Sequence, residues 1–336
     1  ARLADAGLAR LLGWAFGGTT LRTLRVASDA AGDAGIFAAR RERRKANVTA
    51  PCGLEDLALE DLALGGDGCA ALADLLETAP LLRRLSLRRC GAICDFGVSA
   101  LAKRLPPCLE VLDLRGTGCA DAGAARLARA LAARENATAV HVDVGDNLLT
   151  AAGVAALLES PGVATLDCRR NALEPGAGAV LARALARSGV EKLGLAGCGL
   201  GAADAAVLIA AAAKRPSLEV LDLSGNPLTD AEARRRAAKK ANKVLGKLAK
   251  VASKITPPAP AQGDDRDALA DLFAALGKGK FAGLAWLGLE DVGLTPRHRG
   301  LLAASVKARR KRNASSVVVE SIGNDAAKDK RKEPVI

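Results

Sequence analysis

The sequence predicts an α/β solenoid, in which short strands and helices alternate along one extended apolar core. Three observations support this fold class. A short apolar pattern typical of strands occurs nine times, a helical pattern follows most copies, and apolar residues make up 50% of the 336 residues while aromatic residues make up 2%. Because rings are scarce, the core must consist of Leu, Val and Ala, and stacked repeats bury such side chains against their neighbours.

The strand pattern has apolar residues at its first, fourth and sixth positions and a polar residue or cysteine at most ninth positions. Successive copies begin 33, 28, 27, 30, 24, 27, 28 and 66 residues apart. The copies begin at Leu21, Leu54, Leu82, Leu109, Ala139, Val163, Val190, Leu218 and Leu284. A near-constant period of this length is typical of repeat proteins, which usually provide binding surfaces rather than enclosed active sites.

Helical patterns occupy the intervals between the strand segments. After Asp121, for example, Leu127 and Leu131 lie four residues apart and so share one face of a helix. Asp, Thr and Gly at the front of such segments are helix-start residues. Residues 1–20 are predicted to form a cap or the helix of a preceding repeat, and residues 33–46 the helix of the first repeat with a basic end. Each repeat is therefore expected to run strand, turn, helix, turn.

Two motifs carry a resemblance to a known family. The strand pattern matches L-x-x-L-x-L-x-x-N/C-x-L, and residues 121–131 match D-x-G-x-x-x-L-A-x-x-L. Over roughly residues 20–230 and 280–305 the chain resembles leucine-rich-repeat proteins of the ribonuclease-inhibitor-like subtype, as in Ran-type GTPase activators and immune-receptor repeat arrays. The resemblance implies a horseshoe, with a parallel sheet on the concave face and helices on the convex face.

The ninth position of each repeat, the ladder position, departs from the family pattern at the ends of the array. The nine ladder residues are Asp29, Leu62, Cys90, Thr117, Asn147, Asn171, Cys198, Asn226 and Val292. In the family this side chain hydrogen-bonds the turn backbone, so the middle repeats are expected to form these bonds. Terminal repeats of solenoids are usually degenerate caps, and the first, second and ninth repeats are predicted to have that role.

The 66-residue step between the last two strand segments divides the chain into four parts. We expect repeats one to eight with an N-terminal cap over residues 1–230, and a basic helical insertion with a Pro-rich linker over residues 231–267. The final repeat, acting as a C-terminal cap, is predicted over residues 268–304. A basic, partly disordered tail is predicted over residues 305–336.

Sequence motifs for catalysis are missing from the chain. It contains none of the patterns G-x-x-x-x-G-K-[ST], H-E-x-x-H, G-x-S-x-G and C-x-x-C. Its two histidines, His141 and His298, are far apart in sequence. We therefore predict no catalytic residue, no metal site and no cofactor, and hence a protein that is not an enzyme.

The eight cysteines fall within or between repeats, and two of them occupy ladder positions. We interpret them as small buried apolar residues, which favours a reducing compartment and a cytoplasmic location. The basic segment at residues 307–312 gives an alternative, a nuclear-import patch. No apolar run has the length that a membrane span needs.

The candidate functional residues lie on the strand segments. Side chains alternate along a strand. The fourth and sixth residues of each repeat point into the core, so the third, fifth and seventh residues share the open face. Neighbouring strands place these positions in rows, with an acidic row beside a basic row in the middle of the array. The candidate partner-binding residues are Arg84, Arg88, Asp113, Arg115, His141, Asp143, Asp167, Arg169, Asp222 and Trp286.

The sequence leaves two interpretations of these rows open. In the first, the face is an electrostatically patterned docking surface for another protein. In the second, Asp113 pairs with Arg115 and Asp167 pairs with Arg169, without any partner. Trp286 is a candidate hot spot on the same face, or the insertion or tail covers it.

A second candidate contact is the basic insertion. Residues 231–255 carry nine Lys or Arg residues and one Glu. Its candidate basic patch consists of Arg234, Arg235, Arg236, Lys240, Lys247 and Lys254. An apolar seam at heptad spacing lets this helix pack on the convex helices, bind an acidic or helical partner, or rest on an anionic membrane or nucleic acid. The segment has no aromatic residue, which disfavours the membrane and the nucleic acid.

Together these features predict a non-enzymatic scaffold that binds another protein through its concave face and takes no small-molecule substrate. The basic insertion would be a second contact. The resemblance gives the alternative, a GTPase-activating protein for a Ran-like small GTPase. The basic end of this chain departs from the acidic tail found in some of those activators.

Overall fold

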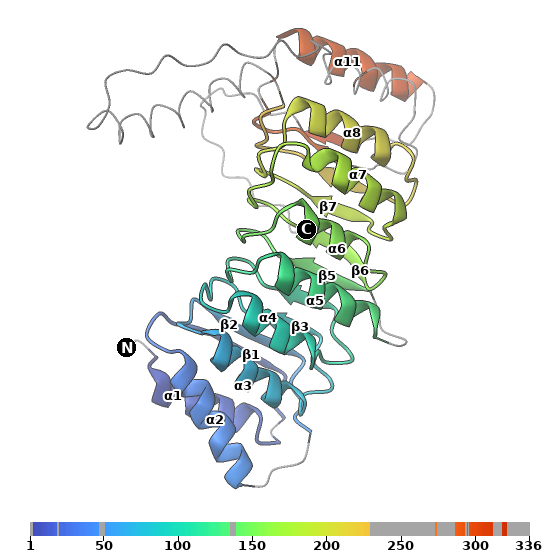
Figure 1. Cartoon of the computed structure of the whole chain (residues 1–336). Coiled ribbons are helices and arrows are strands. Elements are labelled where there is room, and N and C mark those ends of the chain that lie inside the picture. The colour runs from blue at the N-terminus through green and yellow to red at the C-terminus, as the bar shows by residue number, and fades with distance from the viewer. Residues whose placement is uncertain are drawn as a thin grey trace, which may run out of the picture.

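The computed structural model describes residues 3–18, 20–46, 51–134, 139–228, 273, 286–292, 294, 296–311 and 318–320. Helices and strands alternate along them (Figure 1). The helices are α1 (Asp5–Ala15), α2 (Asp33–Lys45), α3 (Gly66–Leu76), α4 (Cys94–Ala102), α5 (Asp121–Ala132), α6 (Ala151–Leu158), α7 (Ala177–Arg187), α8 (Ala202–Ala212) and α11 (Pro296–Lys311). The strands are β1 (Thr23–Ala27), β2 (Asp56–Glu60), β3 (Arg84–Ser86), β4 (Val111–Asp113), β5 (Val140–Asp143), β6 (Val163–Asp167), β7 (Lys192–Gly194), β8 (Val220–Asp222), β9 (Trp286–Gly288) and β10 (Val318–Glu320).

The ten described strands form one parallel sheet, in which each strand pairs with the next along the chain. Equivalent positions of successive repeats lie opposite one another, as Leu85, Leu112 and Val142 do. Helices α1 to α8 pack side by side in the same order (Figure 1). Packed helices need about 8–10 Å each, whereas strands need about 4.8 Å. The array therefore bends toward the sheet, which lines the concave face, and the predicted α/β leucine-rich-repeat solenoid is confirmed.

One apolar core runs along the array between the sheet and the helices. Leucines such as Leu57, Leu72 and Leu82 are fully buried in it. Among the described residues, the aromatic members of this core are Phe16 and Phe273, one near each end of the array. The predicted core of Leu, Val and Ala is confirmed, and the thin layer that it fills explains why the fold needs few rings.

The ladder residue Asn147 joins two neighbouring repeats. Its Oδ1 accepts hydrogen bonds from the backbone N–H groups of Thr117 and Cys119, both at 3.0 Å. Its Nδ2 donates to the carbonyl oxygens of Leu114 and Val144 at 2.8 and 3.0 Å. The side chain is buried, so it satisfies backbone groups that water does not reach. The predicted bonding of the middle repeats is thus confirmed.

The other middle repeats use the ladder position in the same way. Asn171 and Asn226 each accept one backbone N–H and donate to carbonyl oxygens on two repeats. The thiols of Cys90 and Cys198 donate to carbonyl oxygens of the preceding repeat at 3.3 and 3.2 Å. Burial raises the pKa of Cys90 to about 11 and that of Cys198 to about 12, so both thiols keep the proton that they donate.

A second line of inter-repeat bonds follows the starts of the helices. Asp121 Oδ1 accepts from the backbone N–H groups of Thr150 and Gly153, at the start of α6, at 2.8 and 3.0 Å. A Cβ atom at Gly153 would lie 2.3 Å from this oxygen, so the glycine makes room for the carboxylate. Equivalent bonds join Asp5 to Gly32, Asp33 to Gly65 and Asp95 to Ala120. The sequence predicted these aspartates as helix-start residues, and their bonds to the next repeat were not predicted.

The structure adds two details to the expectations about the chain. Within the tail predicted from residue 305, α11 continues to Lys311 and Val318–Glu320 pairs with β9 as a tenth strand. A three-residue run of valine supplies the β-branched side chains that favour a strand. The cysteines are buried as predicted except Cys94 and Cys108, which are exposed. Among the described helices, none has the length and apolar character needed to cross a membrane.

Candidate functional site

The predicted rows of the concave face are present in the register of the sheet. Asp113, Asp143 and Asp167 lie opposite one another on β4, β5 and β6. In the row before them, Arg84 lies opposite Val111, and Val111 opposite His141. In the row after the strands, Arg88, Arg115, Gly145 and Arg169 lie in line, as their carbonyl bonds to the preceding repeats show. Helices pack on the opposite side of this sheet (Figure 1).

The two ion pairs of the interpretation without a partner have different outcomes. Arg169 contacts Asp167 through a 2.7 Å bond from Nε and a second, short contact from Nη2. The pair of Asp113 with Arg115 does not form. Arg115 Nε donates to Asp146 Oδ2 at 2.6 Å, and Asp113 Oδ1 instead accepts the backbone N–H of Arg115 at 2.9 Å. Arg115 and Arg169 therefore stabilise the array itself.

Asp146 has a left-handed backbone conformation, with a φ of 52°, which places its carboxylate beside Arg115. The eighth residue of each repeat from the second onward has a positive φ, and in three repeats it is glycine. In the others it is Asp61, Arg89, Asp146, Arg170 or Asp291, with φ between 52° and 60°. This conformation turns a charged side chain toward the neighbouring repeat, so that Arg89 pairs with Asp61 as Arg115 pairs with Asp146. The recurrent Asp, Arg or Gly before the ladder position was the sequence evidence for this rim of charges.

Asp143 is an acidic group with no cation of its own. Its repeat has Gly145 where others have arginine, and in the part of the chain that the structure describes it forms no ion pair. Its Oδ1 accepts the backbone N–H of Gly145 at 2.8 Å. Burial, followed by the charge of Asp167, raises the pKa of Asp143 to about 6. At neutral pH Asp143 is therefore ionised in the folded protein, and this charge lowers the free energy of unfolding.

Arg88 is the complementary group on the same face. It is half-buried, and its Nε is buried without a hydrogen-bond partner among the described residues. No ion pair within 4 Å involves its guanidinium over the same residues, whereas Arg84 lies 3.9 Å from Asp56. Burial raises the pKa of Asp113, and the charge of Arg88 acts against that rise; the same charge also helps to lower the pKa of Asp61.

The remaining candidate residues lie at the positions predicted for them. His141 is exposed on β5. Asp222 Oδ1 accepts the backbone N–H of Ser224 at 2.9 Å. Trp286 is half-buried, and a Cβ atom at Gly288 would lie 2.4 Å from Trp286 Cη2, so its ring lies over that glycine on the concave face. The candidate basic patch at residues 234–254 lies outside the described residues.

Replacing Asp143 with Asn is expected to stabilise the protein at neutral pH. An unfolded Asp has a pKa of about 3.9, and the folded value is about 6. The folded chain therefore binds this proton more tightly, and the associated stability is present below pH ~4 and lost as pH rises through ~6. Asparagine keeps the acceptor for Gly145 and removes the charge. We expect a gain of about 1–3 kcal/mol in the free energy of unfolding at pH 7.5 and a gain about one third as large at pH 4.5.

Urea unfolding followed by circular dichroism at the two pH values measures this difference. Asp167→Asn is the matched control, because that carboxylate has an ion pair with Arg169 and its loss should destabilise the protein at pH 7.5. If both variants lose stability at pH 7.5, the electrostatic cost assigned to Asp143 is refuted.

Comparison with known proteins places one family model on the array. A model described as a leucine-rich repeat matches residues 215–231, which contain β8 and the ladder residue Asn226. No curated protein matches the chain.

Among solved structures, the chain is similar to an internalin from Listeria monocytogenes, with 13% identity and a TM-score of 0.38, over 96% of this chain and 95% of that one. It is also similar to the Rad7 and Elc1 complex of yeast, with 18% identity and a TM-score of 0.36, over 89% of this chain and 79% of that one. The actin-binding site 2 of leiomodin-1 matches with 14% identity and a TM-score of 0.34, over 56% of this chain and 98% of that one.

Proposed function

We propose that this leucine-rich-repeat solenoid is a non-enzymatic scaffold that binds another protein through its concave face. One observation carries the proposal. On this face Arg115 and Arg169 pair with neighbouring carboxylates, whereas half-buried Arg88 and Asp143 have opposite charges and no direct ion pair among the described residues. A partner protein that places a carboxylate beside Arg88 and a cation beside Asp143 would form an ion pair with each of them.

The register of the sheet fixes the spacing that such a partner must match. Arg88 lies in line with Gly145, two strands away and two residues beyond Asp143, so about 10 Å across the sheet and about 7 Å along the strand, or about 12 Å in all, separate Arg88 from Asp143. Half-buried charges interact more strongly than exposed ones because water screens them less. Exposed His141 beside Asp143 and the ring of Trp286 farther along extend the contact area on the same face.

The proposal includes three narrower statements. The repeats belong to the ribonuclease-inhibitor-like subtype, which the strand–helix alternation of α/β type supports. The protein acts in the cytoplasm, which its free and mostly buried thiols support. It catalyses no reaction, since the carboxylates of this face bond arginines or backbone N–H groups.

Site-specific photo-cross-linking combined with affinity capture tests the proposal. A photoreactive residue at position 141 reports on the concave face, and one at the exposed position 126 on α5 reports on the helix side. We expect the captured partner to cross-link from position 141 and not from position 126. Cross-links from position 126 alone would place the partner on the other face and reject the proposal.

A further inference from the structure

A charged pocket lies on the helix side, near the N-terminal end of the array. It has a volume of about 340 Å³ and lies at the C-terminal ends of α2 and α3. Its charged lining residues are Arg40, Arg43, Arg44, Asp74, Glu77 and Arg104. None of them belongs to the concave face, so the pocket is a second site on the same array.

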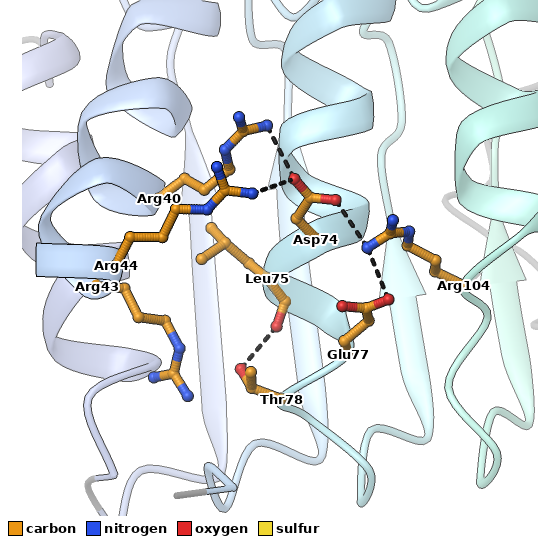
Figure 2. A pocket seen from close by; sticks show the side chains of 8 residues that line it. All are labelled: Arg40, Arg43, Arg44, Asp74, Leu75, Glu77, Thr78 and Arg104. Atoms are coloured by element: carbon orange, nitrogen blue, oxygen red, sulfur yellow. Dashed lines mark hydrogen bonds and ion pairs between the residues drawn. The ribbon is translucent and has the colours of Figure 1, made fainter. Parts of the chain in front are cut away.

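One carboxylate in this pocket is shared by three arginines. Arg40 Nη1 lies 2.9 Å and Arg44 Nη2 3.4 Å from Asp74 Oδ2. Arg104 Nη1 lies 2.8 Å from Asp74 Oδ1 and 2.6 Å from Glu77 Oε1. Figure 2 shows Arg40 and Arg44 meeting Asp74 from one side and Arg104 from the other.

The pocket contains more positive than negative charge. Arg40, Arg44 and Arg104 carry +3 and the two carboxylates −2, which leaves +1. Arg43 lies beside them in a buried position, 9% exposed, and burial lowers the pKa of its guanidinium. Arginine remains charged in proteins. Gathering these cations where water is partly excluded costs free energy that an anion in the pocket would recover.

We propose that this pocket binds the phosphate monoester of a phosphorylated side chain on a partner protein. Such a group carries a charge of about −1.5 to −2 near neutral pH and three acceptor oxygens. This charge offsets the excess of the pocket. Planar guanidinium groups donate paired N–H bonds that fit phosphate oxygens. The proposal rests on the proposed function, because it assumes that the ligand belongs to a protein bound by the array.

An acidic lining residue argues for a protein rather than an anionic membrane. Glu77 has a side chain that is 54% exposed beside Arg104. A flat anionic surface would approach this carboxylate together with the pocket and be repelled by it. A single phosphorylated side chain enters the pocket without bringing further negative charge against it.

The pairing of Asp74 with three arginines makes a distinctive prediction. A bound phosphate competes with this carboxylate for the same N–H donors, so Asp74→Asn is expected to tighten phosphate binding about fivefold even if the variant is less stable. The double variant Arg40→Gln and Arg44→Gln removes two donors that are partly exposed, and it should weaken binding at least about tenfold.

The experiment uses the full chain and inorganic phosphate as the first probe. Thermal unfolding is measured in phosphate and in chloride at equal ionic strength for the wild type, the Asp74 variant and the arginine double variant. Arg126→Gln with Arg129→Gln on α5 is the matched control, since it removes the same charge from exposed positions outside the pocket. We expect phosphate to stabilise the wild type, the control and, more strongly, the Asp74 variant, with the arginine double variant losing the effect.

Two further probes identify the source of the phosphate group. A random peptide library centred on phosphoserine is compared with its serine counterpart, and phosphatidylcholine vesicles with and without a phosphoinositide form the other arm. Preference of the wild type for phosphoserine peptides, lost in the arginine double variant, supports the proposal. Equal stabilisation of all variants by phosphate overturns the site. Phosphate or vesicle binding without a phosphoserine preference overturns the assignment to a partner protein.

The concave face and the pocket can fail independently. Arg88→Gln should leave phosphoserine binding unchanged, because Arg88 lies on the strand side of the array and outside the pocket. Loss of phosphoserine binding in that variant would overturn the pocket as the site.

Discussion

Replacing Asn147 with Ala is expected to lower the free energy of unfolding by about 3–5 kcal/mol. The side chain satisfies backbone N–H groups of Thr117 and Cys119 and carbonyl oxygens of Leu114, Val144 and Gly145. Alanine removes every one of these bonds and leaves buried polar groups that water does not reach. Each unsatisfied group costs about 1–3 kcal/mol, and the effect spans two repeats.

The control for this prediction is Cys198→Ala at the equivalent position of another repeat. That thiol donates to the carbonyl oxygen of Cys168 at 3.2 Å, with a longer contact of 3.7 Å to that of Ala196, and a weak S–H bond contributes less than an amide. We expect a loss of about 1 kcal/mol, which includes the small cavity left by the sulfur atom. Urea unfolding at pH 7.5 measures both variants. Equal losses would show that the ladder asparagine has no special role in the array.

Reversing the charge of Arg88 is expected to weaken partner binding about 100-fold, which corresponds to about 2.8 kcal/mol. Arg88→Glu places a carboxylate where the proposed partner presents one of its own. The milder Arg88→Gln removes the attraction without adding repulsion and should weaken binding about tenfold. Titration calorimetry with the captured partner measures both values.

The choice of Arg88 follows from the structure and not from the row pattern. Arg115 and Arg169 occupy the same row, but their guanidinium groups bond Asp146 and Asp167. Reversing either charge would break an internal pair, so a loss of binding would be mixed with a loss of stability. Arg126→Glu on the helix side is the control for Arg88→Glu, and it should bind the partner normally. A wild-type affinity for Arg88→Glu would remove this residue from the interface.

The repeat pattern predicted the fold because each position has the same environment in every repeat. The fourth and sixth residues are buried in the core in every repeat, and the ninth bonds the backbone where it is Asn or Cys. The β-strand alternation likewise predicted which residues share the concave face. Repetition thus made these inferences reliable without any alignment.

The partners of charged side chains could not be predicted in the same way. The sequence placed Asp113 and Arg115 two residues apart on one face, which suggested a pair. The backbone N–H of Arg115 occupies the carboxylate instead, and the left-handed conformation of Asp146 supplies a better acceptor from the next repeat. Strand periodicity gives the row of a residue, whereas turn geometry decides which neighbour it bonds.

The short tenth strand and the arginine pocket were missed for related reasons. Three valines in a polar region are too few to establish an alternating pattern. The pocket joins the end of α2 to α3 and to Arg104 beyond α4, so its residues come from three repeats. The sequence of a single repeat does not show that arginines from three repeats gather around Asp74 and outnumber the carboxylates there.

The most direct test of the concave face is the affinity of the Asp143→Asn variant for the captured partner. This substitution is expected to stabilise the folded protein at neutral pH, because it removes a carboxylate whose pKa is raised to about 6. Weaker binding by a more stable variant cannot result from unfolding. We predict that calorimetric titration at pH 7.5 gives an affinity about tenfold below that of the wild type. An affinity equal to that of the wild type would contradict the proposal that a partner pairs with this face.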